Sequence, residues 1–402
     1  MNGKYFSNEK VNTGRQPELD LLKAIAVFGM IVIHVFLDLG KNVMPTAVDD
    51  YFTFLFGADI FMICMGIGMC YMRKQTPASY LMRGIGLLTI GQFLNILRNS
   101  IPNLIAYWIT GKQFFIANSL LVLQSDILSF AGLAFLLIAL FKVFHLKNRT
   151  ILGIGVALNL TSLILWNTVA PPQNYLVSQL VGYFIITDAE AYFPLFCYFI
   201  FVAFGLFVGE YYPRIKDKHA LANRVMAICF PVSAVLFILR LLFESPYLPV
   251  VGSDTQYNMQ ATPEAIAGCI FTLALIALLY RITEAVGDRM PKIIYHLSAN
   301  INSYYCVSYL LILPVQTLLI ALTGKVFPGV VIPILYALFV VVACYFLIEW
   351  NNKYWHIHPA NLRGTKLIIF VAATWIATVL IVIYAYPRIE EFANVWNEYL
   401  LP

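Results

Sequence analysis

The chain has 402 residues, of which 60% are apolar and only 12% are charged, and its formal net charge is +5. Soluble domains carry about 25% charged residues, so this composition excludes a soluble enzyme, a nucleic-acid-binding module and a disordered chain. The apolar runs are continuous, which argues against a membrane β-barrel, because barrel strands alternate apolar and polar residues. The composition therefore predicts an all-α, polytopic membrane protein that has the lipid bilayer as a partner and no nucleic-acid partner.

Apolar runs of about 20 residues, the length of a helical span, predict about eleven transmembrane helices. In chain order they cover residues 19–39, 49–72, 80–98, 115–142, 151–168, 190–212, 220–243, 261–284, 293–322, 328–350 and 366–386. Residues 1–402 are expected to form a single membrane domain, with a cytoplasmic N-terminal segment at 1–17 and an outer-face tail at 387–402. Two shorter apolar stretches, 101–114 and 174–187, are expected to be interfacial or re-entrant pieces on the outer face.

The placement of basic residues predicts the orientation, because Lys and Arg concentrate in cytoplasmic loops. With the N-terminus inside, twenty of the 26 basic residues fall on the cytoplasmic side. The outer side keeps six: Lys41, Arg98, Lys112, Arg240, Lys325 and Arg388. This split predicts a cytoplasmic N-terminus, an outer C-terminus and a multi-pass protein of a bacterial-type inner (plasma) membrane.

His34 lies inside the first predicted span, with apolar residues on both sides. It follows Asp20 by fourteen residues, or about 21 Å of helix, which places it in the outer half of the bilayer. Ionisable side chains at membrane depth are costly and mark functional sites. The alternative is a buried histidine that bonds a neighbouring helix. The other histidines lie in or beside cytoplasmic loops, and the pair His356 and His358 has no evident third ligand, so no metal is expected.

Two carboxylates reach a similar depth, Asp59 in the second predicted span and Asp126 in the fourth. A carboxylate beside His34 would fix its tautomer and stabilise the imidazolium, as a general base requires. We therefore expect a catalytic set of His34 with Asp59 or Asp126 as its orienting partner. The alternative for each carboxylate is a structural hydrogen bond between helices. Amide side chains nearby in depth are candidates for substrate binding: Gln92, Asn95 and Gln124.

Basic residues at the cytoplasmic ends of the spans are candidates for binding an anionic head group. We select Lys23, Arg83 and Arg281 for this role. The positive-inside distribution explains these residues equally well without any ligand. Near the C-terminus, the pair Tyr304 and Tyr305 is expected to serve packing or an interfacial aromatic belt.

Two stretches carry a resemblance to known families. Leu19-Asp20-Leu21-Leu22-Lys23, followed by His34, resembles the Leu-Asp-x-Leu-Arg signature of the membrane-bound acyltransferase family 3, with Lys in place of Arg. The segment 57–66 is similar to that family's second-span motif. Residues 122–128 and 192–196 look more like the heparan-α-glucosaminide N-acetyltransferase group. Both families belong to one transmembrane acyltransferase superfamily. The resemblance is specific over residues 18–98 and looser over 119–205, and Ser308 stands where a histidine is frequent.

The resemblance implies a ten-helix acyltransferase core with one extra span. It implies an enzyme that transfers an acyl group, usually acetyl, from cytoplasmic acyl-CoA to a hydroxyl or amine of a glycan-like or small acceptor on the outer side. His34 would abstract the acceptor proton or carry the acyl group, and the basic inner rim would hold the phosphates of acetyl-CoA. Two alternatives stay open: a proton-coupled transporter or flippase without acyl chemistry, and a catalytically inactive binding homologue. The sequence is also compatible with a homodimer.

Overall fold

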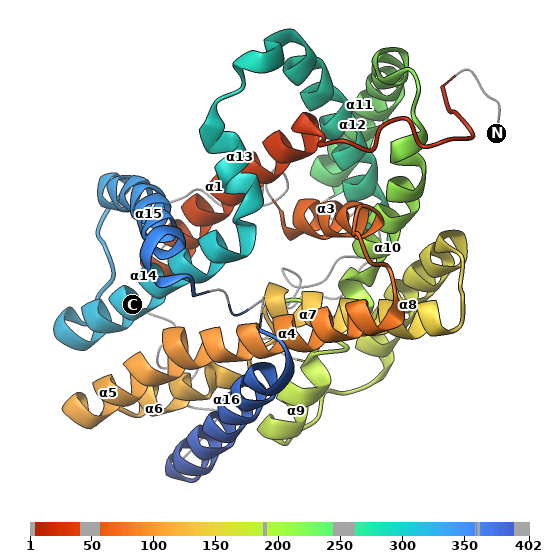
Figure 1. Ribbon diagram of the computed structural model, residues 1–402. Helices are drawn as coiled ribbons and strands as arrows, with labels where there is room; N and C mark the ends of the chain where they lie inside the picture. The colour runs from red at the N-terminus through yellow and green to blue at the C-terminus, as the bar shows by residue number, and fades with distance from the viewer. Residues whose placement is uncertain are drawn as a thin grey trace. The chain divides into compact units, whose positions relative to one another are not determined.

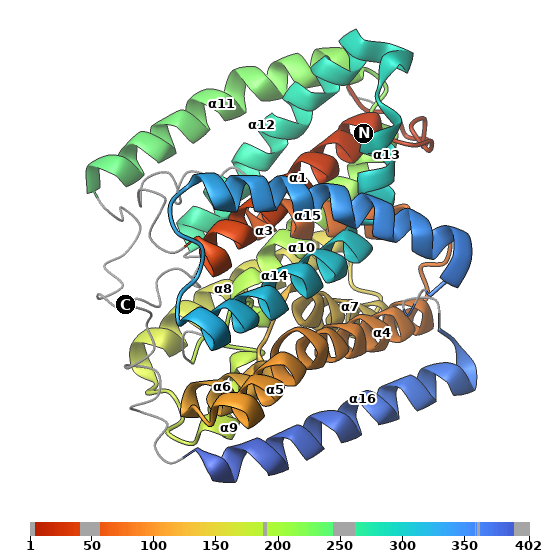
Figure 2. The same cartoon turned by 90° about the vertical axis from the view of Figure 1, so that its left-hand side faces the viewer.

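The computed structural model describes residues 5–40, 57–187, 191–243, 262–357, 359 and 362–389. This part of the chain is helical, with an isolated bridge between Phe6 and Ile215 and no β-strand among the described residues (Figures 1 and 2). Nine of its helices are long and apolar enough to cross a membrane. Shorter apolar helices occupy the two other predicted spans, so the prediction of an all-α polytopic membrane protein is confirmed.

The chain divides into two compact units, and each unit collects three separate stretches. The first unit contains residues 1–26, 57–84 and 133–299, and the second contains residues 27–56, 85–132 and 300–402. Three helices contribute residues to both units: α1 (Pro17–Leu39), α4 (Pro77–Asn95) and α7 (Ile127–Val143).

The first unit is built around α10 (Leu195–Tyr211), a helix whose side chains are mostly buried. It packs against α3 (Ala58–Cys70) and α8 (Asn148–Thr168), while α11 (Lys218–Phe243) and α12 (Thr262–Val286) run side by side (Figures 1 and 2). Smaller elements complete this unit: α9 (Tyr175–Gly182), α13 (Lys292–Ala299), η3 (Tyr212–Arg214) and η5 (Gly287–Arg289).

Glycines allow α3 and α10 to approach closely. A Cβ atom on Gly66 would overlap the backbone oxygen of Val202, and one on Gly205 would overlap the backbone oxygen of Ile63. A Cβ on Gly209, one turn after Gly205, would lie 2.9 Å from the Cys70 sulfur. Small residues four apart are a common way for membrane helices to pack without side chains between them.

The second unit contains α14 (Ile301–Thr323), which packs against α15 (Val331–Trp350) and α5 (Ile101–Thr110). Next to α5 is α6 (Gln113–Ser119), which continues into η2 (Leu120–Leu123), and α16 (Gly364–Ala385) packs against α6 and η2 (Figure 2). The π-helical turn η1 (Ile96–Ser100) joins α4 to α5. Two further short turns end α15 and α16: η6 (Asn351–Trp355) and η8 (Tyr386–Arg388).

The structure corrects three of the expected elements. Residues 101–110 are no separate interfacial piece, because η1 continues the helix from Pro77 to Thr110. The expected span 115–142 is interrupted at residues 124–126, between η2 and α7. The expected span 293–322 is two helices, α13 and α14, which meet at Asn300. The other described span ends agree with the prediction to within a few residues.

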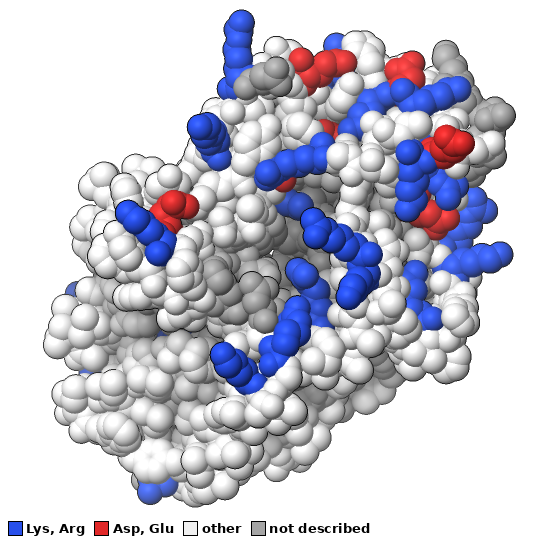
Figure 3. Space-filling view, viewed as in Figure 1, with Lys and Arg blue, Asp and Glu red and all other residues white. Residues whose placement is uncertain are grey.

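Parts of some predictions lie outside the described residues. These are the beginning of the second span at 49–56 and residues 390–402 of the expected outer-face tail. Figure 3 shows that Lys and Arg side chains outnumber Asp and Glu side chains on the face viewed in Figure 1. Which side of the membrane each loop faces stays a prediction.

Candidate functional site

His34 lies on α1 in the second unit, where it contacts Tyr309 of α14. The Tyr309 hydroxyl is 2.8 Å from Nε2 and 2.9 Å from Nδ1 of the imidazole. The two rings are tilted by 50°, with their centroids 4.6 Å apart. The histidine side chain is 29% exposed. An imidazole that is hydrogen-bonded yet reachable can still exchange a proton with a bound molecule.

A carboxylate stands one helical turn after the imidazole. The Oδ2 atom of Asp38 lies 3.9 Å from Nδ1 of His34. This buried oxygen has no hydrogen-bond partner among the described residues. The backbone oxygen of Asp38 accepts a hydrogen bond of 2.6 Å from the Gln316 side chain on α14, which fixes this turn of α1. Asp38 is therefore placed to stabilise a positive charge on His34.

Arg98 brings a buried positive charge to the same region. It lies in the π-helical turn η1 and is 2% exposed. Its Nη2 donates to Oδ2 of Asp126 at 3.2 Å, and its guanidinium lies 4.4 Å from the centre of the Tyr309 ring. A charge inside a membrane helix requires such partners, and π-helical turns often occur at functional sites.

Tyr305 completes this cluster. Its hydroxyl donates to Oδ2 of Asp126 at 3.2 Å and accepts from Nη1 of Arg98 at 3.4 Å. Its ring packs edge-on against that of Tyr309, with centroids 4.8 Å apart. Tyr304 and Tyr305 are both buried, as the packing expectation requires, and the hydrogen bonds of Tyr305 add a polar role that the sequence did not predict. Arg98, one of the six basic residues assigned to the outer side, lies buried within the helix that runs from Pro77 to Thr110.

Asp126 has a second role, at the start of α7. Its Oδ1 accepts a hydrogen bond of 2.9 Å from the Ser129 backbone nitrogen, which is the geometry of a helix N-cap. One carboxylate therefore both starts α7 and pairs with Arg98. The structure places Asp38 next to the imidazole, and Asp126 connects to His34 indirectly, through Arg98 or Tyr305 and then Tyr309.

The predicted substrate-binding amides meet at the interruption between η2 and α7. Gln92 donates to the backbone oxygen of Val122 at 2.8 Å and to Thr378 at 3.0 Å. Asn95 donates to the backbone oxygen of Gln124 at 2.9 Å. Because unbonded carbonyl groups are costly in a membrane, these amides explain how the helix can be interrupted there. The Oδ1 atom of Asn95 is buried without a partner among the described residues.

Asp59 belongs to the first unit, in the first turn of α3. Gly268 of α12 faces this carboxylate, and a Cβ atom on Gly268 would lie 2.9 Å from Oδ2 of Asp59. Because glycine has no side chain, Gly268 leaves room for this carboxylate between the two helices. No ion pair of Asp59 is formed among the described residues.

The three predicted donor-side cations also lie in the first unit. Lys23 is partly buried on α1. Arg83 is exposed and lies 5.4 Å from the centre of the Phe135 ring. Arg281 is held by Glu284 at 3.1 Å and by Asn223. The part of the chain that the structure describes thus pairs Arg281 with a carboxylate, and the binding of phosphates by these three cations stays a prediction.

Three residues of the cluster around His34 belong to no motif: Asp38, Arg98 and Tyr309. The spacing of four between His34 and Asp38 is a signal that they share a helix face. The same spacing relates Tyr305 to Tyr309. For Arg98, the signal is that apolar residues continue on both sides of it, although it stands at the end of the predicted span.

One family model matches the chain, that of heparan-alpha-glucosaminide N-acetyltransferase, catalytic. The match covers residues 15–242, more than half of the chain, and includes His34, Asp38, Arg98 and Asp126. No curated protein and no solved structure matches the chain.

Proposed function

The chain belongs to the heparan-alpha-glucosaminide N-acetyltransferase catalytic family, and we propose that it is a membrane acetyltransferase that uses His34 as its reactive group. The donor is acetyl-CoA on the cytoplasmic side, and the acceptor is a hydroxyl or amine of a glycan-like or small molecule on the outer side. The observation that carries this proposal is the hydrogen-bonded, partly exposed imidazole of His34, with Asp38 one turn away inside a membrane helix.

In the direct route, His34 acts as a general base. The acceptor oxygen or nitrogen attacks the thioester carbonyl while the imidazole takes the acceptor proton. The new C–O or C–N bond forms as the C–S bond breaks, and the thiolate of CoA leaves with the proton that His34 returns. Asp38 and Tyr309 hold the imidazole, and Asp38 balances its positive charge during the proton transfer.

In the covalent route, the imidazole itself attacks the thioester carbonyl. The CoA thiolate leaves, and the acetyl group stays on a ring nitrogen until the acceptor displaces it. In this second step the bond from the acetyl carbon to the acceptor forms, the bond to the ring nitrogen breaks and the neutral imidazole returns, while the acceptor proton passes to solvent and balances the charge of the thiolate released in the first step. The covalent route allows the donor and the acceptor to use the site one after the other, which suits a reaction with substrates on opposite sides of a membrane.

The depth of His34 supports a site that both substrates can reach. Fourteen residues separate it from Asp20 near the start of α1, so a donor arm from the cytoplasm must reach about 20 Å along the helix. Lys23 and Arg83 would hold the phosphates of CoA at the inner end, because cationic side chains form strong hydrogen bonds to phosphate.

The decisive experiment compares His34→Asn with His145→Asn in purified, reconstituted protein supplied with labelled acetyl-CoA. His145 is exposed and has a positive φ of 52°, a conformation that Asn tolerates, so its variant is a matched control. Loss of the base should lower thiol release and acetyl transfer about 100-fold to 10,000-fold. The His145 variant should keep normal activity.

Undiminished transfer by a folded His34→Asn protein would overturn the proposed chemistry. A wild-type protein that neither binds acetyl-CoA nor releases its thiol would favour the transporter alternative. Binding without thiol release would instead indicate an inactive homologue. Labelled acetyl that remains on wild-type protein after rapid denaturation at neutral pH, is released by hydroxylamine and is absent from His34→Asn would select the covalent route.

A further inference from the structure

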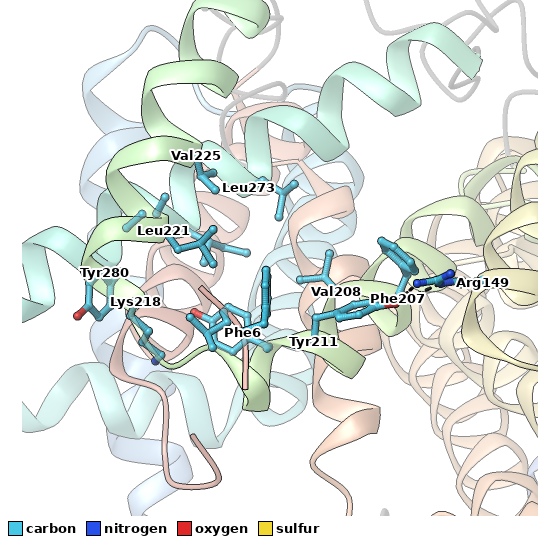
Figure 4. A pocket seen from close by; sticks show the side chains of 15 residues that line it. Phe6, Arg149, Phe207, Val208, Tyr211, Lys218, Leu221, Val225, Leu273 and Tyr280 are labelled. Atoms are coloured by element: carbon cyan, nitrogen blue, oxygen red, sulfur yellow. Dashed lines mark hydrogen bonds between the residues drawn. The ribbon is translucent and has the colours of Figure 1, made fainter. Parts of the chain in front are cut away.

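A large apolar cavity lies in the first unit and contains none of the residues discussed above as catalytic. It has a volume of about 740 Å³, within the range of small-molecule sites. Its lining comes from α8, α10, α11, α12 and the N-terminal segment (Figure 4). Most of these side chains are aliphatic or aromatic, among them Phe207, Val208, Leu221, Val225 and Leu273.

The N-terminal segment forms one wall of the cavity. Phe6 lies among the lining side chains in Figure 4, and its ring packs edge-on against Tyr211 with centroids 6.2 Å apart. Backbone hydrogen bonds of 2.8 Å from Ser7 to Arg214 and from Val11 to Pro213 hold the segment in place. The cavity is therefore a built feature of the first unit, with a wall that the chain anchors by its own backbone.

Two cationic side chains line the cavity, Lys218 and Arg149, and they differ in whether they form an ion pair among the described residues. Lys218 pairs with the buried Glu18 at 2.7 Å, so its charge is balanced. Arg149 donates to the Tyr211 hydroxyl at 2.7 Å and 3.1 Å, but a phenol carries no negative charge. Among the residues that the structure describes, no carboxylate forms an ion pair with Arg149.

An apolar chamber with a cation at its edge that forms no ion pair among the described residues fits an alkyl chain that carries an anionic head. We propose that this cavity binds an acyl chain of an anionic phospholipid, with its phosphate at Arg149 and Tyr211. Adenine and several phosphates, as in CoA, would need many more polar partners than this lining offers. The predicted orientation places Arg149 on the cytoplasmic side, where the inner leaflet supplies such lipids.

The charge of the site is tested by a matched pair of variants, Arg149→Gln and Arg73→Gln. Arg73 is exposed, belongs to the same unit and is predicted to face the same side, so it controls for general attraction to an anionic surface. Purified full-length protein is equilibrated with vesicles of phosphatidylcholine and phosphatidylglycerol, and the retained lipid is measured by mass spectrometry. Arg149→Gln should reduce the preference for phosphatidylglycerol about five-fold, while Arg73→Gln leaves it unchanged.

The cavity itself is tested by filling it. Ala222→Phe places a ring in the chamber, and Val225→Phe on the next turn of α11 is a second filled variant. Ala157→Phe, on an exposed part of α8, is the control for an added ring. Both filled variants should retain at least five-fold less phosphatidylglycerol than the control, with elution volume and thermal unfolding used to select folded protein.

Three outcomes would overturn the proposal. The first is equal lipid retention by a folded filled variant and the Ala157→Phe control. The second is an equal effect of the Arg149 and Arg73 variants, which would indicate surface attraction only. The third is displacement of the lipid by acetyl-CoA, which would assign the cavity to the donor. None of these outcomes depends on the role of His34, so the two proposals fail or survive separately.

Discussion

At the scale of single residues, the polar side chains around His34 stabilise one another inside a membrane domain. Arg98 and Asp126 neutralise each other's charge while both are at most 3% exposed. Tyr305 bonds both, and Tyr309 lies between the guanidinium and His34. Because each of these residues interacts with another, the interactions together offset the desolvation free energy of burying the charges of Arg98 and Asp126. The partly exposed end of the cluster is His34, where we expect the chemistry.

Tyr309→Phe tests whether the hydroxyl positions His34. We expect kcat to fall about 5-fold with the KM for acetyl-CoA unchanged, because one hydrogen bond is worth about 1 kcal/mol and the donor end of the site is untouched. Tyr336→Phe is the matched control, since the Tyr336 hydroxyl also donates one hydrogen bond, of 2.7 Å, to the Leu311 backbone. Equal kcat values for the two variants would show that Tyr309 only packs against the imidazole.

At the scale of elements, the polar cluster depends on two departures from regular helix. The π-helical turn η1 places Arg98 in the interior and continues the helix into α5. The interruption before α7 places Asp126 at an N-cap, and the amides of Gln92 and Asn95 bond the carbonyls that the interruption frees. Irregular backbone at membrane depth persists only where protein satisfies it in this way.

The contact between α3 and α10 offers a test of helix packing. Gly205→Ala introduces a Cβ that overlaps the Ile63 backbone, so it should destabilise the first unit by about 1–3 kcal/mol. Gly68→Ala on α3 is the control, because nothing lies within 4 Å of its Cβ position and alanine favours helix. A thiol-reactive dye that reports exposure of the buried Cys64 and Cys197 on heating should show a lower midpoint for Gly205→Ala only. Equal midpoints would contradict the close approach.

At the scale of the whole molecule, the described helices account for the eleven predicted spans. Nine are long enough by themselves, and α3, α6 and α7 fall in the other two. The placement of 20 of the 26 basic residues predicts the orientation of these spans. The orientation decides which substrate meets which end of the site. It also decides whether the cavity beside Arg149 faces the inner leaflet.

Single-cysteine substitutions test the orientation. Lys325→Cys, between α14 and α15, should react with a membrane-impermeant maleimide in intact cells, because this loop is predicted to face outward. Lys147→Cys, between α7 and α8, should react only after permeabilisation. Both lysines are exposed, so neither position is limited by burial, and the parent protein gives the background from its seven cysteines. The reverse pattern would invert the predicted topology.

The sequence by itself determined the class of protein, the approximate helix bounds and the position of His34 within a span, because hydropathy and helical length are local properties. It also contained the spacing that joins His34 to Asp38. Only the tertiary structure decided the partners of these residues. Tyr309 lies 275 positions after His34 and Asp126 lies 28 positions after Arg98, so their contacts arise from helix packing. A carboxylate at the right depth can face several helices, and packing selects the one cation that it neutralises.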